Sequence, residues 1–329
     1  TQRMSFNIGN IEIKTPVFLA PMSGVSDLPF RKLVKSYGAG LVFSEMIASR
    51  EMIAEKSRSV KMNENYAEEF PMAVQLAGCC PETMAKAAQM NVERGAAIID
   101  INFGCPVKKV VNKMAGSALM QDEGLATEIM AATVEAVDVL VTMKMRLGWN
   151  AENLNAPSIA RKAQDVGIKM ITVHGRTREQ RYTGTADWKA VRASRDATSL
   201  PLIVNGDILT PADAITAMEQ SGADGVMIGR GSQGRPWILK QVMDYMECGK
   251  IGDEPDMEEK LHLILTHYNM ILEYYGERKG VPFARKHLSW YCTGFDGAAE
   301  FRKELNTLKN PDDVRRRLRE FFIPLKGAA

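Results

Sequence analysis

The stretch PLIVNGDILTPADAITAMEQSGADGVMIGRG, residues 201–231, decides the fold class. Its two ends are short apolar runs that stop at glycine and polar residues. Between them Thr210 can cap a helix, Pro211 suits the first helical position, and Gly222 suits the end. The apolar residues are continuous rather than alternating, which is typical of parallel strands covered on both faces. The stretch therefore predicts a strand–helix–strand unit of a parallel sheet.

The same unit recurs along most of the chain. Short apolar runs end in Gly, Pro, Asn or Asp, and stretches with helical spacing separate them. Eight strand–helix units in about 220 residues fit a (β/α)₈ barrel better than an open sheet. The eight runs are 16–21, 40–46, 71–78, 96–104, 141–148, 170–177, 201–208 and 224–231.

The two flanks of this pattern predict further parts. SFNIGNIEIK, residues 5–14, favours a small hairpin that plugs the barrel floor. After about residue 250 the strand runs stop, and apolar residues recur at three- and four-residue spacing, which is typical of helices. We therefore expect a barrel domain over 1–250, with its hairpin in 1–15, and a helical domain over 251–329.

Composition excludes several classes of protein. The 329 residues carry a net charge of +2, five cysteines without a CxxC pair, and four histidines without an HxxxH pair. We expect neither a disulfide framework nor a metal site. No run of 18 apolar residues occurs, and the first twenty residues lack the apolar core of a signal peptide. The expectation is a cytoplasmic protein that does not enter the membrane.

Polar groups stand at nearly every predicted strand tip. Barrel active sites lie at the C-terminal ends of the strands. Each residue alone has an ordinary structural explanation, but together they predict a pocket for an anionic, heteroaromatic cofactor. The tips are Pro21, Met22, Ser23, Glu45, Gln75, Asn102, Cys105, Lys144, Arg146, His174, Arg176, Asn205, Gly206, Asp207, Gly229 and Arg230.

The last two tips, NGD at 205–207 and GRGSQGRPW at 229–237, favour a phosphate site. Backbone amides beside glycine can approach an anion there, as they often do after strands seven and eight of such barrels. GRGSQG also matches GxGxxG, but no strand with an acidic tip follows it, so a dinucleotide site is disfavoured. A mononucleotide phosphate, as in a flavin, fits better.

Cys105 is placed unusually, between Gly104 and Pro106 where an apolar run gives way to a loop. A structural cysteine is commonly packed as a small hydrophobe. The turn predicted here instead holds the thiol at a strand tip, facing the pocket. The stretch alone leaves both interpretations open.

Seven motifs in order give the chain a close resemblance to the tRNA-dihydrouridine synthases, in particular their bacterial B-type branch. Two residues, Ser23 and Phe103, differ from those that many members of this family have at these positions, but neither difference removes a chemical function. The motifs are APMSGVSDLPFR (20–31), NFGCP (102–106), TMKMRLGW (142–149), VHGRTREQRYTGTADW (173–188), NGDI (205–208), DGVMIGRGSQGRPW (224–237) and RKHLSWY (285–291).

The resemblance implies an FMN-bearing barrel that reduces uridines of tRNA, in the D-loop, to 5,6-dihydrouridine with NADPH. It implies that Cys105 is the catalytic acid and that Asn102, Arg146, Arg176 and Arg178 face the substrate. We also expect a monomer. The implied FMN contacts are Pro21, Met22, Ser23, Gln75, Lys144, His174, Asn205, Gly206, Asp207, Gly229 and Arg230.

This activity explains the position of the cysteine. Reduction of the 5,6 double bond needs a hydride at carbon 6, which reduced flavin can deliver, and a proton at carbon 5. An ordinary thiol, with a pKa of about 8.5, is mostly protonated at neutral pH yet donates readily. Lys144 would place positive charge near the pyrimidine end of the flavin. The target base must also leave its stack.

Basic residues after Arg278 predict the tRNA contacts. Twelve basic residues oppose six acidic ones from there to the end of the chain. Clusters of this kind next to Trp290 and Tyr291 favour phosphate contacts with some stacking, although a solvated helix face is the simpler explanation for any one arginine. The candidate backbone contacts are Arg285, Lys286, Arg315, Arg316 and Arg317.

Two other functions would explain only some of these sequence features. A flavin barrel that acts on free pyrimidines, of the dihydroorotate dehydrogenase type, shares the strand-tip cysteine but gives no reason for a basic helical appendage. A catalytically silent RNA-binding regulator leaves the cysteine and the phosphate site unexplained.

Overall fold

The computed structural model describes residues 5–54 and 64–324, and it is built around a closed barrel of eight parallel strands. Each strand pairs with the next along the chain, and the last pairs with the first, so the predicted fold is confirmed. The strands are β3 (Val17–Leu19), β4 (Leu41–Phe43), β6 (Met72–Ala77), β7 (Ile98–Phe103), β8 (Leu140–Arg146), β9 (Ile171–His174), β10 (Leu202–Asn205) and β11 (Gly225–Ile228). A short strand, β5 (Ile47–Ala48), also pairs with the end of β6.

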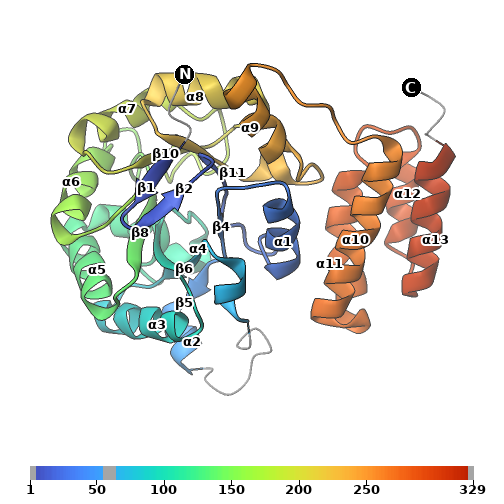
Figure 1. Cartoon of the computed structure of the whole chain (residues 1–329). Helices are drawn as coiled ribbons and strands as arrows, with labels where there is room; N and C mark the ends of the chain where they lie inside the picture. The colour runs from blue at the N-terminus through green and yellow to red at the C-terminus, as the bar shows by residue number, and fades with distance from the viewer. Residues whose placement is uncertain (1–4, 55–63, 325–329) are drawn as a thin grey trace.

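Helices surround the barrel (Figure 1). In α8, Thr210 caps the first turn, its side chain accepting from the backbone N–H of Asp213, and Gly222 ends the helix with φ +71°. Both predicted boundaries are therefore confirmed. The helices are α1 (Leu28–Ser36), α2 (Ser49–Ala54), α3 (Pro81–Glu93), α4 (Lys108–Val111), α5 (Glu123–Ala136), α6 (Ala156–Val166), α7 (Trp188–Ala197), α8 (Pro211–Ser221) and α9 (Ile238–Cys248), with 3₁₀ turns at Tyr66–Glu69, Gly116–Gln121 and Arg230–Ser232.

A two-stranded hairpin closes the barrel floor. β1 (Phe6–Ile8) pairs antiparallel with β2 (Ile11–Ile13). Ile8 and Ile13 are fully buried and pack in one cluster with Phe18 and Phe43 from the barrel strands. Residues 1–4 of the hairpin segment lie outside the described residues. Because apolar side chains fill the floor, the opposite end of the barrel is the one available for polar chemistry.

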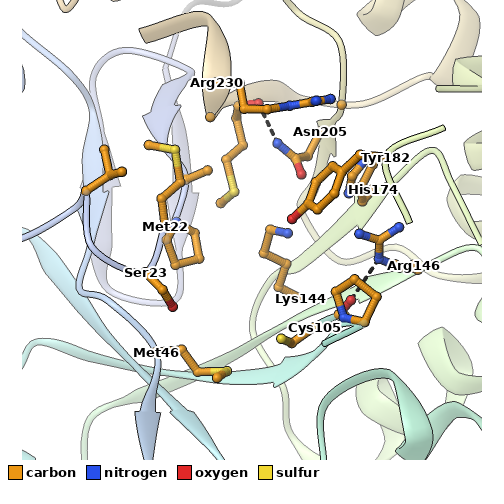
Figure 2. A pocket seen from close by; sticks show the side chains of 18 of the residues that line it. Met22, Ser23, Met46, Cys105, Lys144, Arg146, His174, Tyr182, Asn205 and Arg230 are labelled. Atoms are coloured by element: carbon orange, nitrogen blue, oxygen red, sulfur yellow. Dashed lines mark hydrogen bonds between the residues drawn. The ribbon is translucent and has the colours of Figure 1, made fainter. Parts of the chain in front are cut away.

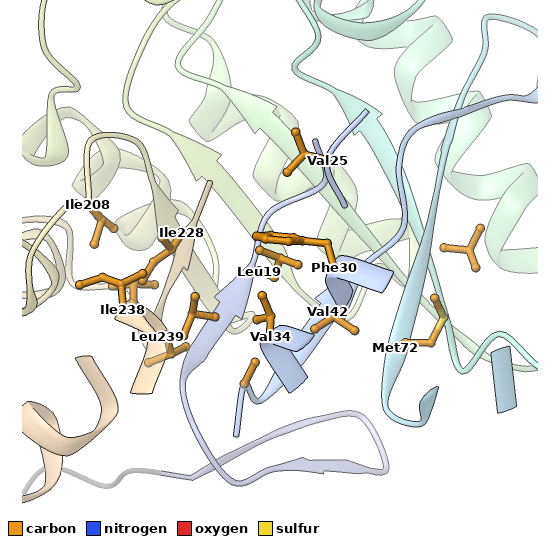
Figure 3. Packing of buried hydrophobic residues seen from close by; sticks show 14 of the residues in the cluster. Leu19, Val25, Phe30, Val34, Val42, Met72, Ile208, Ile228, Ile238 and Leu239 are labelled. Carbon is orange, nitrogen blue, oxygen red and sulfur yellow. The ribbon is translucent and has the colours of Figure 1, made fainter. Parts of the chain in front are cut away.

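The main core lies between the strands and the helices. Outward-facing strand residues such as Val42 and Met72 pack in it, and Phe30 and Val34 of α1 enter it from the helix side (Figure 3). The alternate strand residues face the barrel axis. This alternation sends Asp100 and Asn102 of β7 inward, while Ile99, a member of the core, faces outward.

Four helices form a separate layer beside the barrel (Figure 1). They are α10 (Met257–Tyr275), α11 (Glu277–Tyr291), α12 (Ala298–Leu305) and α13 (Pro311–Phe322). The rings of His267 and His287 lie 5.7 and 5.5 Å from that of Phe30, and the Tyr275 hydroxyl donates to Asp27 at 2.7 Å. These contacts dock the helical region against α1 and the loop before it. Among the described residues, no helix is long and apolar enough for a membrane span.

Candidate active site

A cavity of about 360 Å³ opens at the C-terminal mouth of the barrel (Figure 2). This volume lies in the range typical of small-molecule sites. All eleven residues predicted to contact FMN line it, as do three of the five predicted catalytic and substrate-side residues. Those lining residues are Pro21, Met22, Ser23, Gln75, Asn102, Cys105, Lys144, Arg146, His174, Asn205, Gly206, Asp207, Gly229 and Arg230.

The loop that carries Cys105 is held from three sides. The Asn102 side-chain oxygen accepts from the backbone N–H of Gly104 at 3.0 Å and from that of Cys105 at 2.9 Å. The Ser117 hydroxyl donates to the Cys105 carbonyl at 2.8 Å. Arg146 Nε donates to the Gly104 carbonyl at 2.7 Å. Because the backbone on both sides of the thiol is bonded, the half-buried thiol has a defined position at the cavity wall.

The cavity has a cationic wall. Figure 2 shows Lys144, Arg146 and His174 on one side, opposite Met22 and Ser23. Burial and the neighbouring Arg146 lower the pKa of Lys144 to about 8. Burial, reinforced by the nearby cations, also holds the pKa of His174 well below its usual range, so its imidazole is neutral at pH 7. Among the described residues, neither Lys144 nor Arg146 forms an ion pair with a carboxylate. Arg146 already donates to the carbonyls of Gly104, Thr177 and Arg181, so Lys144 is the more available of the two to an electron-rich ligand.

The opposite end of the cavity is formed by the last two strand tips. Gly206 has φ +113°, and a Cβ there would lie 2.7 Å from the His174 ring, so only glycine fits. Arg230 is half exposed and lies 3.3 Å from Asp207. Although partial burial opposes ionisation, hydrogen bonds from Arg176 and the Ala186 N–H lower the pKa of Asp207. Because its side chain remains half exposed, Arg230 can bind an anion that enters this end of the cavity from solvent.

These features suit a flavin mononucleotide. The cationic wall offers donors to a heteroaromatic ring, and the glycine-lined end beside Arg230 leaves backbone accessible to a phosphate. Among the described residues, no three His, Cys, Asp or Glu side chains gather as a metal site requires.

Arg176 and Arg178 do not line the cavity. Arg176 is buried, pairs with Asp207 at 2.8 Å and donates to the carbonyls of Thr183 and Gly184. It therefore fixes the loop after β9 from outside the cavity lining, and its contact with the substrate stays a prediction. Arg178 stacks its guanidinium 4.5 Å from the Trp149 ring centroid, outside the cavity lining.

Tyr182 lines the cavity and was missed by sequence reasoning. Its half-exposed ring lies at the mouth, with the guanidinium carbons of Arg146 and Arg230 at 5.4 and 4.8 Å from its centroid. It stands within the motif 173–188, four residues before Ala186, and its place in a loop gave no strand-tip signal. An exposed aromatic ring between two arginines offers a surface on which a base can stack.

The predicted tRNA-binding arginines are mostly engaged within the protein. Arg285 donates to the Leu308 carbonyl at 3.1 Å. Arg317 pairs with Glu304 at 2.6 Å and also with Glu320. Arg315 pairs with Asp312 at 2.6 Å, and Arg316 with Asp313 at 3.1 Å. Lys286 is closer to the cavity, since its ammonium lies 3.0 Å from the position of a Cβ on Gly24, the residue between Ser23 and Val25 of the cavity lining.

Solved structures resemble this chain in fold. Histamine dehydrogenase from Rhizobium sp. 4-9 superposes with a TM-score of 0.58 at 14% identity, covering 82% of this chain and 51% of its own. Morphinone reductase superposes with a TM-score of 0.54 at 13% identity, covering 78% and 91%. At these identities the likeness supports the barrel alone.

Sequence relatives are much closer. The probable tRNA-dihydrouridine synthase of Rickettsia bellii is 51% identical over 316 residues, 96% of this chain and 97% of its own. The tRNA-dihydrouridine synthase B of Pseudomonas aeruginosa is 44% identical over 315 residues, 96% of this chain and 95% of its own. The family model described as Dihydrouridine synthase (Dus) matches residues 18–325. With this coverage and identity, the chain belongs to the dihydrouridine synthase family.

Proposed function

We propose that this protein is an FMN-dependent enzyme that uses NADPH to reduce uridines of tRNA to 5,6-dihydrouridine. The observation that carries the proposal is Cys105, held at a strand end in the wall of a cavity lined by cations. Relatives named tRNA-dihydrouridine synthase support the substrate. The D-loop as the target, the monomeric state and the domain division at residue 250 remain predictions.

The residues of the cavity divide the work of binding. Arg230 and the backbone around Gly206 and Gly229 would hold the phosphate, and Lys144 would donate to the pyrimidine ring of the flavin. When bound, FMN would supply the hydride that carbon 6 of uracil gains, with NADPH as the source of electrons. Neutral His174 can donate or accept one hydrogen bond without adding charge to the wall.

Cys105 completes the reduction. Its thiol would give a proton to carbon 5 as carbon 6 gains the hydride, and the thiolate would later regain a proton from solvent. The uracil thereby gains one hydride at carbon 6 and one proton at carbon 5, and no other group is transferred. Because the target base must enter the cavity, it has to leave the RNA stack, and Tyr182 at the mouth offers a ring for it to stack on.

A single reconstitution experiment tests this function. Protein purified with its flavin should release one FMN per chain on acid precipitation, because the cavity suits a mononucleotide. After reduction by NADPH in the absence of oxygen, an unmodified tRNA transcript should reoxidise the flavin and gain dihydrouridine, measured by mass spectrometry. Orotate should not reoxidise it. Release of FAD would contradict the cofactor, and reoxidation by orotate alone would favour the free-pyrimidine enzyme.

We also propose that tRNA contacts the barrel rim more directly than the arginines of α13. Lys108 and Lys109 begin α4, within four residues of Cys105, and both side chains are exposed. Neither forms an ion pair with another described residue. Val107, between them and the thiol, lines the cavity. A phosphate group beside a uridine held in the cavity would therefore lie near these lysines.

The comparison of two variants tests the rim. Lys108→Ala/Lys109→Ala should weaken tRNA binding and reduce the slope of log affinity against log salt by about 0.7 to 0.9 for each phosphate that the variant no longer neutralises. Arg315→Ala/Arg316→Ala/Arg317→Ala should change the slope less, because those arginines already pair with acids. Flavin reduction by NADPH serves as the control for both. If the slope changed more in the arginine variant than in the lysine variant, α13 rather than the barrel rim would be the main tRNA contact.

A further inference from the structure

A buried carboxylate lies beneath the cavity, outside its lining. Asp100 of β7 is fully buried. One of its oxygens accepts from Gln75 Nε2 and the other from the Thr142 hydroxyl, both at 2.7 Å. The register of the barrel places these three residues side by side, since Gln75 pairs with Asp100 and Asp100 with Thr142. A buried carboxylate needs hydrogen bonds or an opposite charge to offset its lost hydration, and here Gln75, Thr142 and the positive charge of Lys144 favour its ionised form.

A chain of hydrogen bonds leads from this carboxylate to the catalytic loop. Gln75 Oε1 accepts from Asn102 Nδ2 at 2.9 Å. The Asn102 oxygen then accepts from the backbone N–H groups of Gly104 and Cys105. Asp100 and Asn102 are two residues apart on β7 and therefore face the same side of the sheet. These hydrogen bonds therefore connect Asp100, in the barrel interior, with the backbone of Cys105 at the cavity wall.

The carboxylate at one end of this chain and the two backbone N–H donors at the other end require the same direction of every hydrogen bond. An ionised carboxylate only accepts, so the Gln75 amide must turn its nitrogen toward Asp100 and its oxygen toward Asn102. Asn102 must then turn its nitrogen toward Gln75 and its oxygen toward the loop. If Asn102 were reversed, its NH₂ would face two backbone N–H donors. Burial raises the pKa of Asp100 to about 6, which leaves it ionised at neutral pH.

We infer that Asp100 is a positioning residue for Cys105, fixing through Gln75 and Asn102 the hydrogen-bond direction that holds the Gly104–Cys105 backbone. The inference rests on the proposed role of Cys105 as proton donor. A misplacement of about 1 Å can cost about 10²-fold in rate, so a loosened loop would slow proton transfer without touching the thiol.

Two substitutions at the same carboxylate separate this role from a purely structural one. Asp100→Asn is isosteric but removes the charge that reinforces this direction, because an asparagine can both donate and accept. Thr142→Val also removes a buried hydrogen bond to Asp100, yet leaves the carboxylate and its bond to Gln75 intact. A structural role predicts that both variants behave alike. A positioning role predicts that only Asp100→Asn changes the behaviour of Cys105.

The first measurement is the rate of Cys105 alkylation by iodoacetamide in the flavin-free protein, followed by peptide mass spectrometry. Asp100→Asn should raise it several-fold, since the released loop exposes the thiol, and Thr142→Val should not. Asn102→Ala should raise it at least as much, and adding Asp100→Asn to Asn102→Ala should have no further effect. Equal rates in wild type and Asp100→Asn, or equal changes in both Asp100→Asn and Thr142→Val, would overturn the inference.

The second measurement uses the flavin-loaded enzyme. Asp100→Asn should slow reoxidation by tRNA about 10- to 100-fold and increase its solvent deuterium isotope effect, while reduction by NADPH keeps its rate. If tRNA does not reoxidise even the wild type, the proposed function fails, but the alkylation comparison still decides the role of Asp100. Should Asp100→Asn not fold, Gln75→Met, which breaks the same chain one residue later, replaces it in the alkylation assay.

Discussion

Replacing Cys105 by alanine is expected to lower dihydrouridine formation in tRNA by about 10²- to 10⁴-fold, the usual contribution of general acid catalysis. The reason is geometric, because Asn102, Ser117 and Arg146 together hold the backbone around this thiol at the cavity wall. The flavin should remain bound and should still be reduced by NADPH, since that hydride transfer involves no RNA. The measurement is single-turnover reoxidation of the reduced flavin by tRNA.

A second cysteine provides the control. Cys248 lies at the exposed end of α9, where its thiol donates to the Asp244 carbonyl at 3.0 Å, and it is not among the residues that line the cavity. Cys248→Ala should reoxidise at the wild-type rate. If Cys105→Ala also turned over at nearly that rate, the thiol would be a structural one and another group would have to protonate carbon 5.

The sequence predicts the barrel because each strand is a short apolar run that ends at Gly, Pro, Asn or Asp. Each of the eight runs coincides with one observed strand, and the polar residues that mark its tip lie at or near the C-terminal end of that strand. Since parallel strands converge at one mouth, the tip residues had to gather there. For this reason, the residues at the predicted strand ends include most of those that line the cavity.

The sequence does not reveal the partner of a charged side chain when that partner is distant along the chain. Arg176 stands at a strand tip like Arg146, but its partner Asp207 lies 31 residues further on, and their pairing turns the guanidinium into the loop. Arg317 pairs with Glu304, 13 residues away on another helix. A cluster of basic residues is visible in the sequence, whereas its neutralisation by such partners depends on tertiary packing.

Asp100 illustrates a related limit. In the sequence it is one acidic residue inside an apolar run, which resembles a solvent-exposed strand position. Its meaning appears only when the register of the barrel places Gln75 and Thr142 beside it. Tyr182 was missed for the opposite reason, since a loop residue has no periodic pattern to reveal which way it points.

The largest expected effect on stability comes from Arg31→Met. Arg31 of α1 is 2% exposed and pairs with Glu69 at 2.7 Å and with Glu64 at 3.0 Å. It also donates to the Ser26 carbonyl at 2.9 Å, at the end of the loop that lines the cavity. Removing one partner of a buried ion pair typically costs about 3 to 5 kcal/mol, because the remaining charge is left without compensation. We expect a loss of that size in the free energy of unfolding, measured by urea titration.

An exposed pair of similar geometry is the matched control. Lys113 and Glu51 lie 3.1 Å apart, but their side chains are 62% and 53% exposed. Water screens such a pair, so Lys113→Met should cost no more than about 1 kcal/mol. If both substitutions had the same small effect, burial of the Arg31 network would contribute little to stability.

The double variant Arg31→Met/Glu69→Met identifies the source of the cost. If the guanidinium itself stabilises the fold, removing its partner as well should bring no recovery. If the cost comes from the carboxylate of Glu69, which is 5% exposed, the double variant should be more stable than Arg31→Met alone. Glu64 keeps a partner in either case, since the Tyr274 hydroxyl of the helical region donates to it. We expect the recovery, because at this contact between α1 and the helical region the two carboxylates shielded from water, rather than the arginine, make the pairing necessary.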